Sequence, residues 1–325
     1  MIAKILKSKS GTFAGVTYNI NKIDQHKGEL MLTANFGPLE AFSNLRPQDY
    51  INYLLMISRQ NKRVTNPQFH AVISGKGNMY DDQTLTDVAV DYLKEMGYGE
   101  QPYLIVCHKD TDNVHVHMVT TRVDRNGKKI DSAFEKIRSV NALNKILGYD
   151  FALRYRFSTE AQFYMILEAC GFAGRDYIGS KLQKKIETYA LDKARAAELK
   201  ALFIAEKDNP DFIKVLKDNK VELIFHSSEG KKVYGYSVID HASRQVFKGS
   251  EILSLKYLAH DYSESNSFIP AGRAPAEVNT ALEKETKNLP ESVHLGPVLI
   301  ADDIDDQQVL GMKRRRQGKA RTNTR

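Results

Sequence analysis

The sequence is poor in cysteine and contains no long apolar segment. Its 325 residues include two cysteines, Cys107 and Cys170, which are too few for a disulfide framework or a cysteine-based zinc site. No apolar run approaches the roughly 20 residues that a bilayer-spanning helix requires. Residues 1–8 lack the basic segment, apolar run and cleavage site of a signal peptide. These absences predict a cytoplasmic protein without membrane insertion.

What remains is the composition of an ordinary globular chain. It is 42% hydrophobic and 27% charged, which excludes a mainly disordered or collagen-like protein. Its length suggests about two domains at the usual ~150 residues each. An excess of 47 Lys and Arg over 40 Asp and Glu gives a net charge of +7. This excess is compatible with nucleic-acid binding but does not establish it.

Part of the positive charge lies at the C-terminus. Residues 313–316 are Lys-Arg-Arg-Arg, and they follow an acidic segment at 302–306. From about residue 261 the sequence is rich in serine, proline and charge, which predicts an irregular segment with a basic tail over 261–325. The tail can be interpreted as a solvated terminus or as a phosphate-binding arm.

The first half of the chain reads as alternating strands and helices. Strands are predicted at 2–6, 68–74, 103–107 and 114–120. Helices are predicted from residue 13, over 47–60, over 84–96 with Thr84 as a candidate N-cap, and over 139–147. The last two strands form an antiparallel hairpin around an Asp- and Asn-rich turn.

The composition of the sequence changes after about residue 157. A mostly helical segment runs to about residue 218, and a second hairpin follows over 221–239. We therefore expect one domain over 1–150 and a helical plus small α+β domain over 157–260.

Three histidines in the first hairpin form the most specific pattern in the sequence. His115 and His117 lie two apart on one predicted strand, so their side chains project from the same face. His108 ends the preceding strand, and the turn can bring it beside the other two. The full H-x6-H-x-H spacing arises in roughly one in a hundred or more shuffled sequences. Three converging imidazoles leave open positions on a divalent ion, as a catalytic metal site needs.

The residues of this region also have simpler interpretations. The three histidines could be surface or core residues of a half-buried strand. Asp110, a candidate catalytic residue, and Asp112 either orient a histidine ring by accepting its second N–H or stabilise the turn. His70, on the strand at 68–74, either lines the same cleft or is an ordinary half-buried histidine.

The candidate nucleophile is a tyrosine. A metal can polarise a phosphoryl oxygen, but the displacement also needs an attacking group. Water would make a hydrolase, whereas a tyrosine hydroxyl would form a covalent phosphotyrosine that permits religation. Tyr18 stands out among 16 tyrosines because it lies opposite the apolar stripe of its predicted helix. An ordinary surface tyrosine would fit the same position.

Taken together, these motifs resemble those of the relaxases, the mobilization nucleases of mobilizable plasmids and integrative elements. The matching segments are residues 14–19, which contain Tyr18, and residues 69–74, 92–103, 108–117 and 122–130. The resemblance covers about residues 1–150 well, and a looser likeness extends over 221–249.

The resemblance implies the histidine-hydrophobic-histidine (HUH) endonuclease fold, an α+β fold with an antiparallel sheet and flanking helices. It implies Tyr18 as the nucleophile and His108, His115 and His117 as the metal ligands. His70 matches a recurrent family histidine to which we assign no role. Mn²⁺ or Mg²⁺ is expected in function, and Zn²⁺ or Ni²⁺ is chemically admissible.

The implied reaction is the nicking of one DNA strand at an origin of transfer, with the protein left on the 5′ end and able to religate. Expected partners are single-stranded or cruciform origin DNA, accessory mobilization proteins and a coupling protein. The remaining length cannot hold a helicase or primase module, so unwinding has to come from elsewhere. Four basic residues are candidate phosphate contacts or, individually, solvated charges: Lys76, Arg122, Lys128 and Lys129.

Three alternatives remain open at the level of sequence. A rolling-circle replication initiator or a single-strand transposase would share the tyrosine chemistry. A DNA-binding accessory protein would bind without metal-dependent cleavage. A metal-dependent hydrolase would use water and would not form a covalent adduct.

Overall fold

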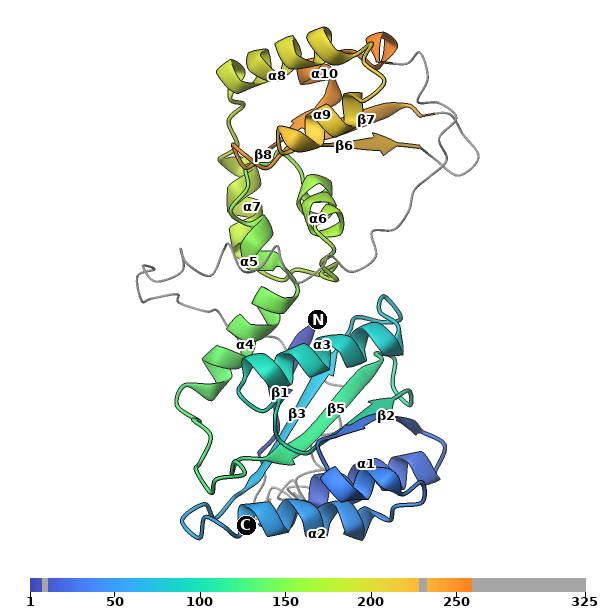
Figure 1. Cartoon of the computed structure of the whole chain (residues 1–325), viewed down its shortest axis with the longest axis vertical. Coiled ribbons are helices and arrows are strands. Elements are labelled where there is room, and N and C mark those ends of the chain that lie inside the picture. The colour runs from blue at the N-terminus through green and yellow to red at the C-terminus, as the bar shows by residue number, and fades with distance from the viewer. Residues whose placement is uncertain (8–10, 228–232, 259–325) are drawn as a thin grey trace, which may run out of the picture. The chain divides into compact units, whose positions relative to one another are not determined.

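The computed structural model describes residues 1–7, 11–227 and 233–258 of the chain. The irregular segment and basic tail predicted at 261–325 lie outside these residues. The described chain forms two compact units, one over residues 1–146 and one that begins at Leu147 (Figure 1). Among the described residues, no helix has the length and apolar character needed to cross a membrane.

A five-stranded antiparallel sheet organises the first unit. Its strands are β1 (Ile2–Ile5), β2 (Gly28–Ala34), β3 (Gln68–Ser74), β4 (Tyr103–His108) and β5 (His115–Thr121). Their order in the sheet is β1-β3-β5-β4-β2, and every neighbouring pair is antiparallel. β5 is therefore the central strand, and β3 and β4 flank it. The α+β fold with an antiparallel sheet, predicted from the sequence, is confirmed.

The strand register gathers the histidines on one face of the sheet. His108 lies directly opposite His115 in the β4–β5 pair, and Val72 lies opposite His117 in the β3–β5 pair. Since successive side chains of a strand alternate between faces, these four residues share one face and Val116 points to the other. The sheet therefore has a site face, which carries the histidines, and a packing face, to which Val116 points.

Helices α1 (Ala14–Asp24) and α2 (Pro47–Ser58) cover the face that carries the histidines. Pro47 begins α2, where its missing N–H is tolerated in the first turn. The apolar side chains of this layer are Phe13, Val16, Phe36, Tyr50, Ile51, Leu54, Leu104 and Val119. Because Val119 follows His117 by two positions along β5, this core fills one end of the face and the histidines occupy the other.

Helices α3 (Asp82–Glu95) and α4 (Glu135–Ile146) lie on the opposite side of the sheet (Figure 1). Both begin earlier than the sequence predicts. Thr84 is not the N-cap of α3: Asp81 is, and its side chain accepts the Thr84 backbone N–H at 2.6 Å. An aspartate is favoured at this position because its charge also complements the positive end of the helix dipole.

The sequence analysis does not predict strand β2. It pairs with β4 as an edge strand, and its register shifts between Leu30 and Leu32. This irregularity breaks the two-residue alternation by which a half-buried strand is recognised. A short 3-10 helix, η1 (Gly37–Ala41), follows β2 before α2 begins.

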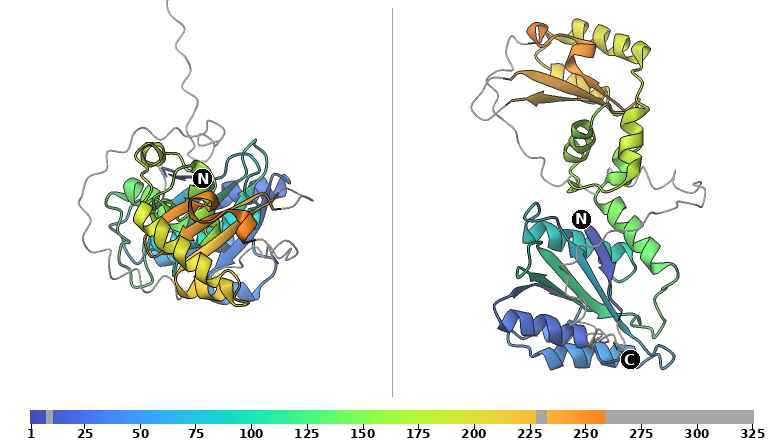
Figure 2. Two further views of the ribbon diagram at one scale, coloured as in Figure 1. Left: turned by 90° about the horizontal axis from the view of Figure 1, so that it is seen from above. Right: turned by 180° about the vertical axis from the view of Figure 1, so that it is seen from behind.

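The second unit combines helices with a small antiparallel sheet in the order β6-β7-β8. Its elements are α5 (Tyr149–Ala152), α6 (Glu160–Ala169), α7 (Ser180–Glu187), α8 (Lys193–Glu206), α9 (Phe212–Asp218), β6 (Val221–His226), β7 (Gly235–Asp240), β8 (Gln245–Lys248), α10 (Gly249–Ile252) and η2 (Leu255–Tyr257). Helices α8 and α9 pack on the sheet through a shared core that includes Phe203, Phe212 and Phe247 (Figures 1 and 2). The helical segment and small sheet expected after residue 157 are present.

Candidate metal centre and nucleophile

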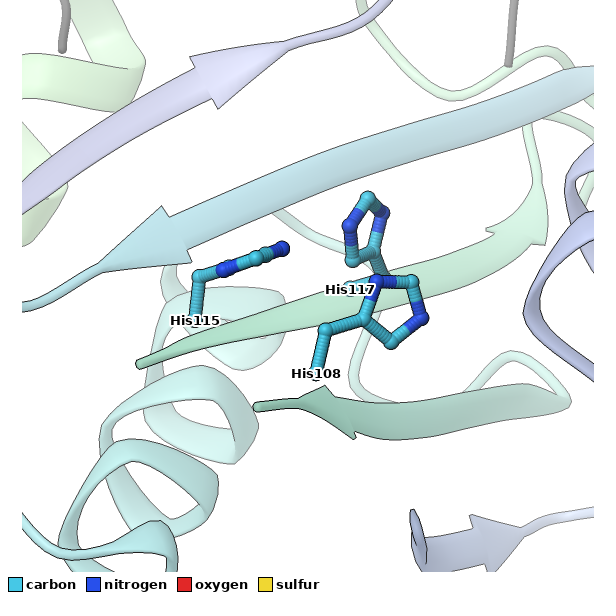
Figure 3. A group of neighbouring side chains, drawn as sticks. All are labelled: His108, His115 and His117. Atoms are coloured by element: carbon cyan, nitrogen blue, oxygen red, sulfur yellow. The ribbon is translucent and has the colours of Figure 1, made fainter. Parts of the chain in front are cut away.

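His108, His115 and His117 bring their imidazole rings together on the open end of the sheet face (Figure 3). One ring nitrogen of each histidine lies within 4.8 Å of those of the other two. The ring centroids of His108 and His117 are 4.2 Å apart, and His115 lies 5.2 and 5.3 Å from them. All three side chains are buried. The group is the one cluster of metal-ligating side chains found in the described part of the chain.

Hydrogen bonds orient two of these rings. Nδ1 of His115 lies 2.9 Å from the backbone carbonyl of Asn113, to which it can donate. Nδ1 of His117 lies 2.9 Å from Nε2 of His70, a buried histidine on β3. Since these contacts use the Nδ1 side of both rings, a metal ion would be bound through Nε2 of each. Outer partners of this kind fix the angle and tautomer of metal-binding histidines.

The ring of His108 indicates that the three histidines suit a cation. Nε2 of His108 is buried and has no hydrogen-bond partner in the described residues. A buried polar atom without a partner is costly unless a ligand satisfies it. Three imidazole nitrogens around one point suit a divalent ion and leave further coordination positions open. The residues present therefore could hold a metal ion.

Burial favours the neutral form of His70, His108 and His117. Desolvation, together with the nearby charge of His115, lowers the pKa of His108 to about 3. Desolvation and the neighbouring His108 lower the pKa of His70 to about 3. The pKa of His117 is held well below its usual value by desolvation and the surrounding histidines. A neutral imidazole carries the lone pair that a metal needs, so the site is ready to bind at neutral pH.

Tyr18 lies beside this cluster. Its ring centroid is 5.7 Å from that of His108 and 5.9 Å from that of His117. It is half-buried and packs against Leu6 and Val72. The expectation that packing does not account for an aromatic at this position is therefore wrong. The apolar stripe of α1 packs in the core shared with α2, whereas Tyr18 packs in a separate cluster with Leu6 and Val72.

Gly15 allows α1 to approach the sheet this closely. Its backbone N–H donates to Oε1 of Gln68 at 2.9 Å. A Cβ atom at this position would lie 2.7 Å from Nδ1 of His70, a distance that side chains do not tolerate. Glycine inside a helix costs about 1 kcal/mol relative to alanine, so its presence near Tyr18 is a sequence signal of close packing.

Asp110 contacts a lysine and not a histidine ring. Its Oδ2 lies 2.5 Å from Nζ of Lys22, and both side chains are largely buried. Burial opposes ionisation of Asp110, but the hydrogen bond and charge of Lys22 outweigh it and hold the pKa below its ordinary value. The predicted bond from Asp110 to a ring N–H is not found in the described residues. Lys22, which the sequence analysis missed, follows Tyr18 by one helical turn.

The other acidic candidate, Asp112, is exposed in the loop between β4 and β5. Its side chain makes no contact with a site histidine in the part of the chain that the structure describes. The neighbouring Asn113 supports the loop, because its Oδ1 accepts the backbone N–H of Gly77 at 2.6 Å. Of the two interpretations of Asp112, the geometry favours a turn residue.

Arg122 is engaged in a largely buried ion pair. Its guanidinium pairs with both carboxylate oxygens of Glu135, and it lies 5.2 Å from the centroid of Phe69. The side chains of Arg122 and Glu135 are 15% and 13% exposed. Phe69 belongs to the packing face of the sheet, where it stacks on Tyr98. The ion pair engages the charge of Arg122 at the start of α4, which argues against the predicted phosphate contact.

The remaining basic candidates are exposed lysines at opposite ends of β5. Lys76 lies in the loop after β3, next to Gly75, whose N–H donates to the carbonyl of Val114 beside the histidines. Lys128 and Lys129 lie in the turn beyond the far end of β5. Only Lys76 is therefore near the metal centre along the strand.

Comparison with known families identifies the nuclease unit. The family model described as relaxase, MobA/VirD2-like, nuclease domain, matches residues 18–148. The match starts at Tyr18 and contains all three histidines of the cluster as well as His70. No curated protein and no solved structure gives a significant match to the chain. The resemblance to the relaxases expected from the sequence is thus confirmed for residues 18–148, which match the nuclease domain of that family.

Proposed function

We propose that the protein nicks one strand of DNA at an origin of transfer and remains covalently attached to the 5′ end through Tyr18. The observation that carries this proposal is the position of the Tyr18 ring, within 6 Å of the rings of His108 and His117, inside a relaxase nuclease domain. A tyrosine hydroxyl beside a metal-binding histidine cluster is the arrangement needed for phosphoryl transfer to the protein.

In this proposal His108, His115 and His117 hold a divalent ion, with Mn²⁺ or Mg²⁺ as the functional one. When bound, the ion would polarise a phosphoryl oxygen and neutralise charge that develops during the displacement. His70 acts as a positioning residue, because its hydrogen bond to His117 fixes the angle of that ring.

The strand transfer itself is an exchange of one phosphodiester for another. The hydroxyl of Tyr18 loses its proton, its oxygen bonds to phosphorus, and the bond from phosphorus to the 3′ oxygen breaks. The 3′ oxygen leaves as a hydroxyl after taking up a proton, and the 5′ phosphate stays on the tyrosine. Because the phosphotyrosine keeps the phosphodiester energy, a 3′ hydroxyl can reverse the reaction and religate the strand.

The wider setting belongs to the same proposal. The protein would act in the cytoplasm during conjugative mobilization, with accessory mobilization proteins and a coupling protein as partners. Residues 1–150 would form the nicking domain and residues 157–260 a separate domain. Exposed lysines, Lys76 among them, would contact the DNA backbone.

The test is the capture of a covalent adduct. Single-stranded oligonucleotides that tile the DNA around the coding sequence, labelled on the 3′ side, are incubated with the full chain and Mn²⁺ or Mg²⁺ and run on a denaturing gel. We expect a metal-dependent protein–DNA adduct with one tile, absent in Tyr18→Phe and in His115→Ala.

Other outcomes would assign the chain to one of the alternatives. Cleavage that persists in Tyr18→Phe without an adduct would point to a hydrolase that uses water. Tight binding to one tile without cleavage would point to an accessory DNA-binding protein. An adduct on a replication origin would move the chain to the rolling-circle initiators, which share the chemistry.

A further inference from the structure

Lys22 places a positive charge next to a site that is already built for a cation. Its ammonium nitrogen lies 5.7 Å from the centroid of the Tyr18 ring and 2.5 Å from Asp110. Desolvation is the main cause of the lowered pKa values of His108 and His117, and the charge of Lys22 makes a small further contribution. A positive charge at this position opposes the binding of a cation by the histidines.

The ion pair between Asp110 and Lys22 is a second observation that argues against a site for a cation alone. Asp110 lies two residues after His108, where its carboxylate could have supplied a fourth, anionic ligand. Instead the carboxylate holds Lys22 through a hydrogen bond between groups 15% and 19% exposed. The three histidines supply no negative charge, and the ion pair is neutral as a whole. A divalent ion would therefore leave the site with surplus positive charge beside Tyr18, and an anion would compensate it.

Contacts with two different parts of the fold fix the position of the Lys22 side chain. Tyr18 and Lys22 are four residues apart on α1 and so share one face of the helix. Asp110 belongs to the loop after β4, 88 positions along the chain. Gly28 of β2 lies under this end of α1, and a Cβ there would be 3.6 Å from Cβ of Lys22 and 3.0 Å from the His108 ring. The ammonium group is thus fixed relative to both the nucleophile and the ligands.

We infer that Lys22 is a phosphate-contacting catalytic residue, and that Asp110 is the positioning residue that holds it. The inference rests on the proposed function, since the phosphate is the scissile phosphodiester that Tyr18 attacks. Lys22 would neutralise its non-bridging oxygens, whose charge grows as the fifth bond to phosphorus forms. An ammonium group has three N–H donors, so a bond to Asp110 is compatible with donation to phosphate.

The experiment compares a loss of charge on the protein with a loss of charge on the DNA. The full chain carries Tyr18→Phe so that binding is measured without cleavage. The probe is the tile that forms the adduct with the unmodified chain, made either with a natural scissile phosphate or with an uncharged methylphosphonate at that single position. Affinity is measured by fluorescence anisotropy in Mn²⁺ for Lys22 and for Lys22→Gln.

We expect Lys22→Gln to weaken binding of the natural oligonucleotide about tenfold or more, the range of a hydrogen bond to a charged group. The methylphosphonate should weaken binding to the lysine protein in the same way. The methylphosphonate should have little further effect on the binding of Lys22→Gln, because this variant lacks the positive charge that would contact the scissile phosphate. Effects that multiply in full would show that Lys22 and the scissile phosphate are independent, and would overturn the inference.

Three controls separate a phosphate contact from other roles. Lys27→Gln removes an exposed lysine just beyond the same helix and should respond to the methylphosphonate as the lysine protein does. Lys22→Arg keeps the charge and should recover part of the affinity. Mn²⁺ affinity of the DNA-free protein, measured by calorimetry, should be unchanged or higher in Lys22→Gln, whereas a fall would indicate a role in the metal centre instead.

Failure of this inference can be told apart from failure of the proposed function. If no tile forms an adduct with the chain that carries Tyr18, the nicking proposal fails and the phosphate role fails with it. If the adduct forms but the two losses of charge act independently, only the role of Lys22 is overturned.

Discussion

His70 and His117 share a hydrogen bond of 2.9 Å between Nε2 of the former and Nδ1 of the latter, and both rings are buried. A ligating histidine presents a lone pair on Nε2 and a proton on Nδ1, so in the metal-competent state His117 donates and His70 accepts. The partner of this ligand is thus a neutral imidazole, where a carboxylate would have added negative charge to the site.

Removing this partner should weaken metal binding. For His70→Ala we expect about a 10- to 100-fold loss of Mn²⁺ affinity, the usual effect of losing an outer partner of a ligating histidine. Titration calorimetry on the DNA-free protein measures it. His241→Ala is the matched control, because His241 bonds to Tyr155 in the second unit. Equal Mn²⁺ affinity in the His70 variant and the parent protein would exclude a positioning role.

Stability of the metal-free protein should fall as the pH is lowered below neutrality. The pKa values of His70 and His108 are about 3 in the folded state, whereas an unfolded histidine titrates near 6.5. Between these values the unfolded chain binds more protons, so the free energy of unfolding decreases by up to about 1.4 kcal/mol per pH unit for each histidine. The loss begins near pH 6.5 and is complete only below pH 3.

Urea unfolding of the first unit at pH 7 and at pH 5 tests this dependence, in a window where ordinary carboxylates stay ionised. His70→Gln should show a shallower fall between the two pH values because one of the low-pKa groups is missing. An unchanged midpoint between pH 7 and pH 5 would contradict the buried, neutral state of these rings.

Gly15→Ala should impair the nuclease although alanine is the better helix former. Alanine would stabilise an isolated helix by about 1 kcal/mol, but its Cβ would lie 2.7 Å from His70 and 3.1 Å from Oε1 of Gln68. Overpacking of this kind costs about 1–3 kcal/mol and would push α1, with Tyr18, away from the histidines. We expect slower adduct formation in a protein that still folds. Asn21→Ala, at an exposed position of the same helix, should leave the rate unchanged.

Arg122 should matter for stability and not for DNA affinity. Arg122→Gln would leave Glu135 without its positively charged partner in a largely buried site, and breaking such a pair typically costs about 3–5 kcal/mol. Chemical denaturation should show this loss, while DNA binding measured well below the unfolding transition stays within about twofold of the parent. Lys128→Ala, an exposed lysine beyond β5, is the control and should leave stability within about 0.5 kcal/mol. A variant that unfolds normally but loses DNA affinity would restore the phosphate role for Arg122.

The sequence predicts those parts of the site that follow from local patterns of residues along one strand or hairpin. His115 and His117 follow from the two-residue alternation of a strand, and His108 from the short turn of a hairpin. The family resemblance placed Tyr18 in the same site. The geometry adds a reason that a helical wheel cannot supply, because a wheel does not show that α1 contacts both α2 and the sheet.

The parts that sequence missed depend on contacts between distant segments. Lys22 meets Asp110 across 88 positions, and nothing local distinguishes this lysine from a solvated one. Arg122 resembled a phosphate contact because its charge was visible and its partner Glu135 was not. Strand β2 was missed because a shift of register interrupts its alternation.

Because β5 is the central strand of the sheet, binding of a metal ion by its histidines would report correct folding. β5 is hydrogen-bonded on both sides, with His115 opposite Ser74 of β3 and opposite His108 of β4. A slip of one residue would turn both of its histidines towards α3 and bring Val116 to the site face. Metal binding would therefore require the correct register between β4 and β5, which carry the three histidines, and a sheet with an alternative pairing would not bind the ion.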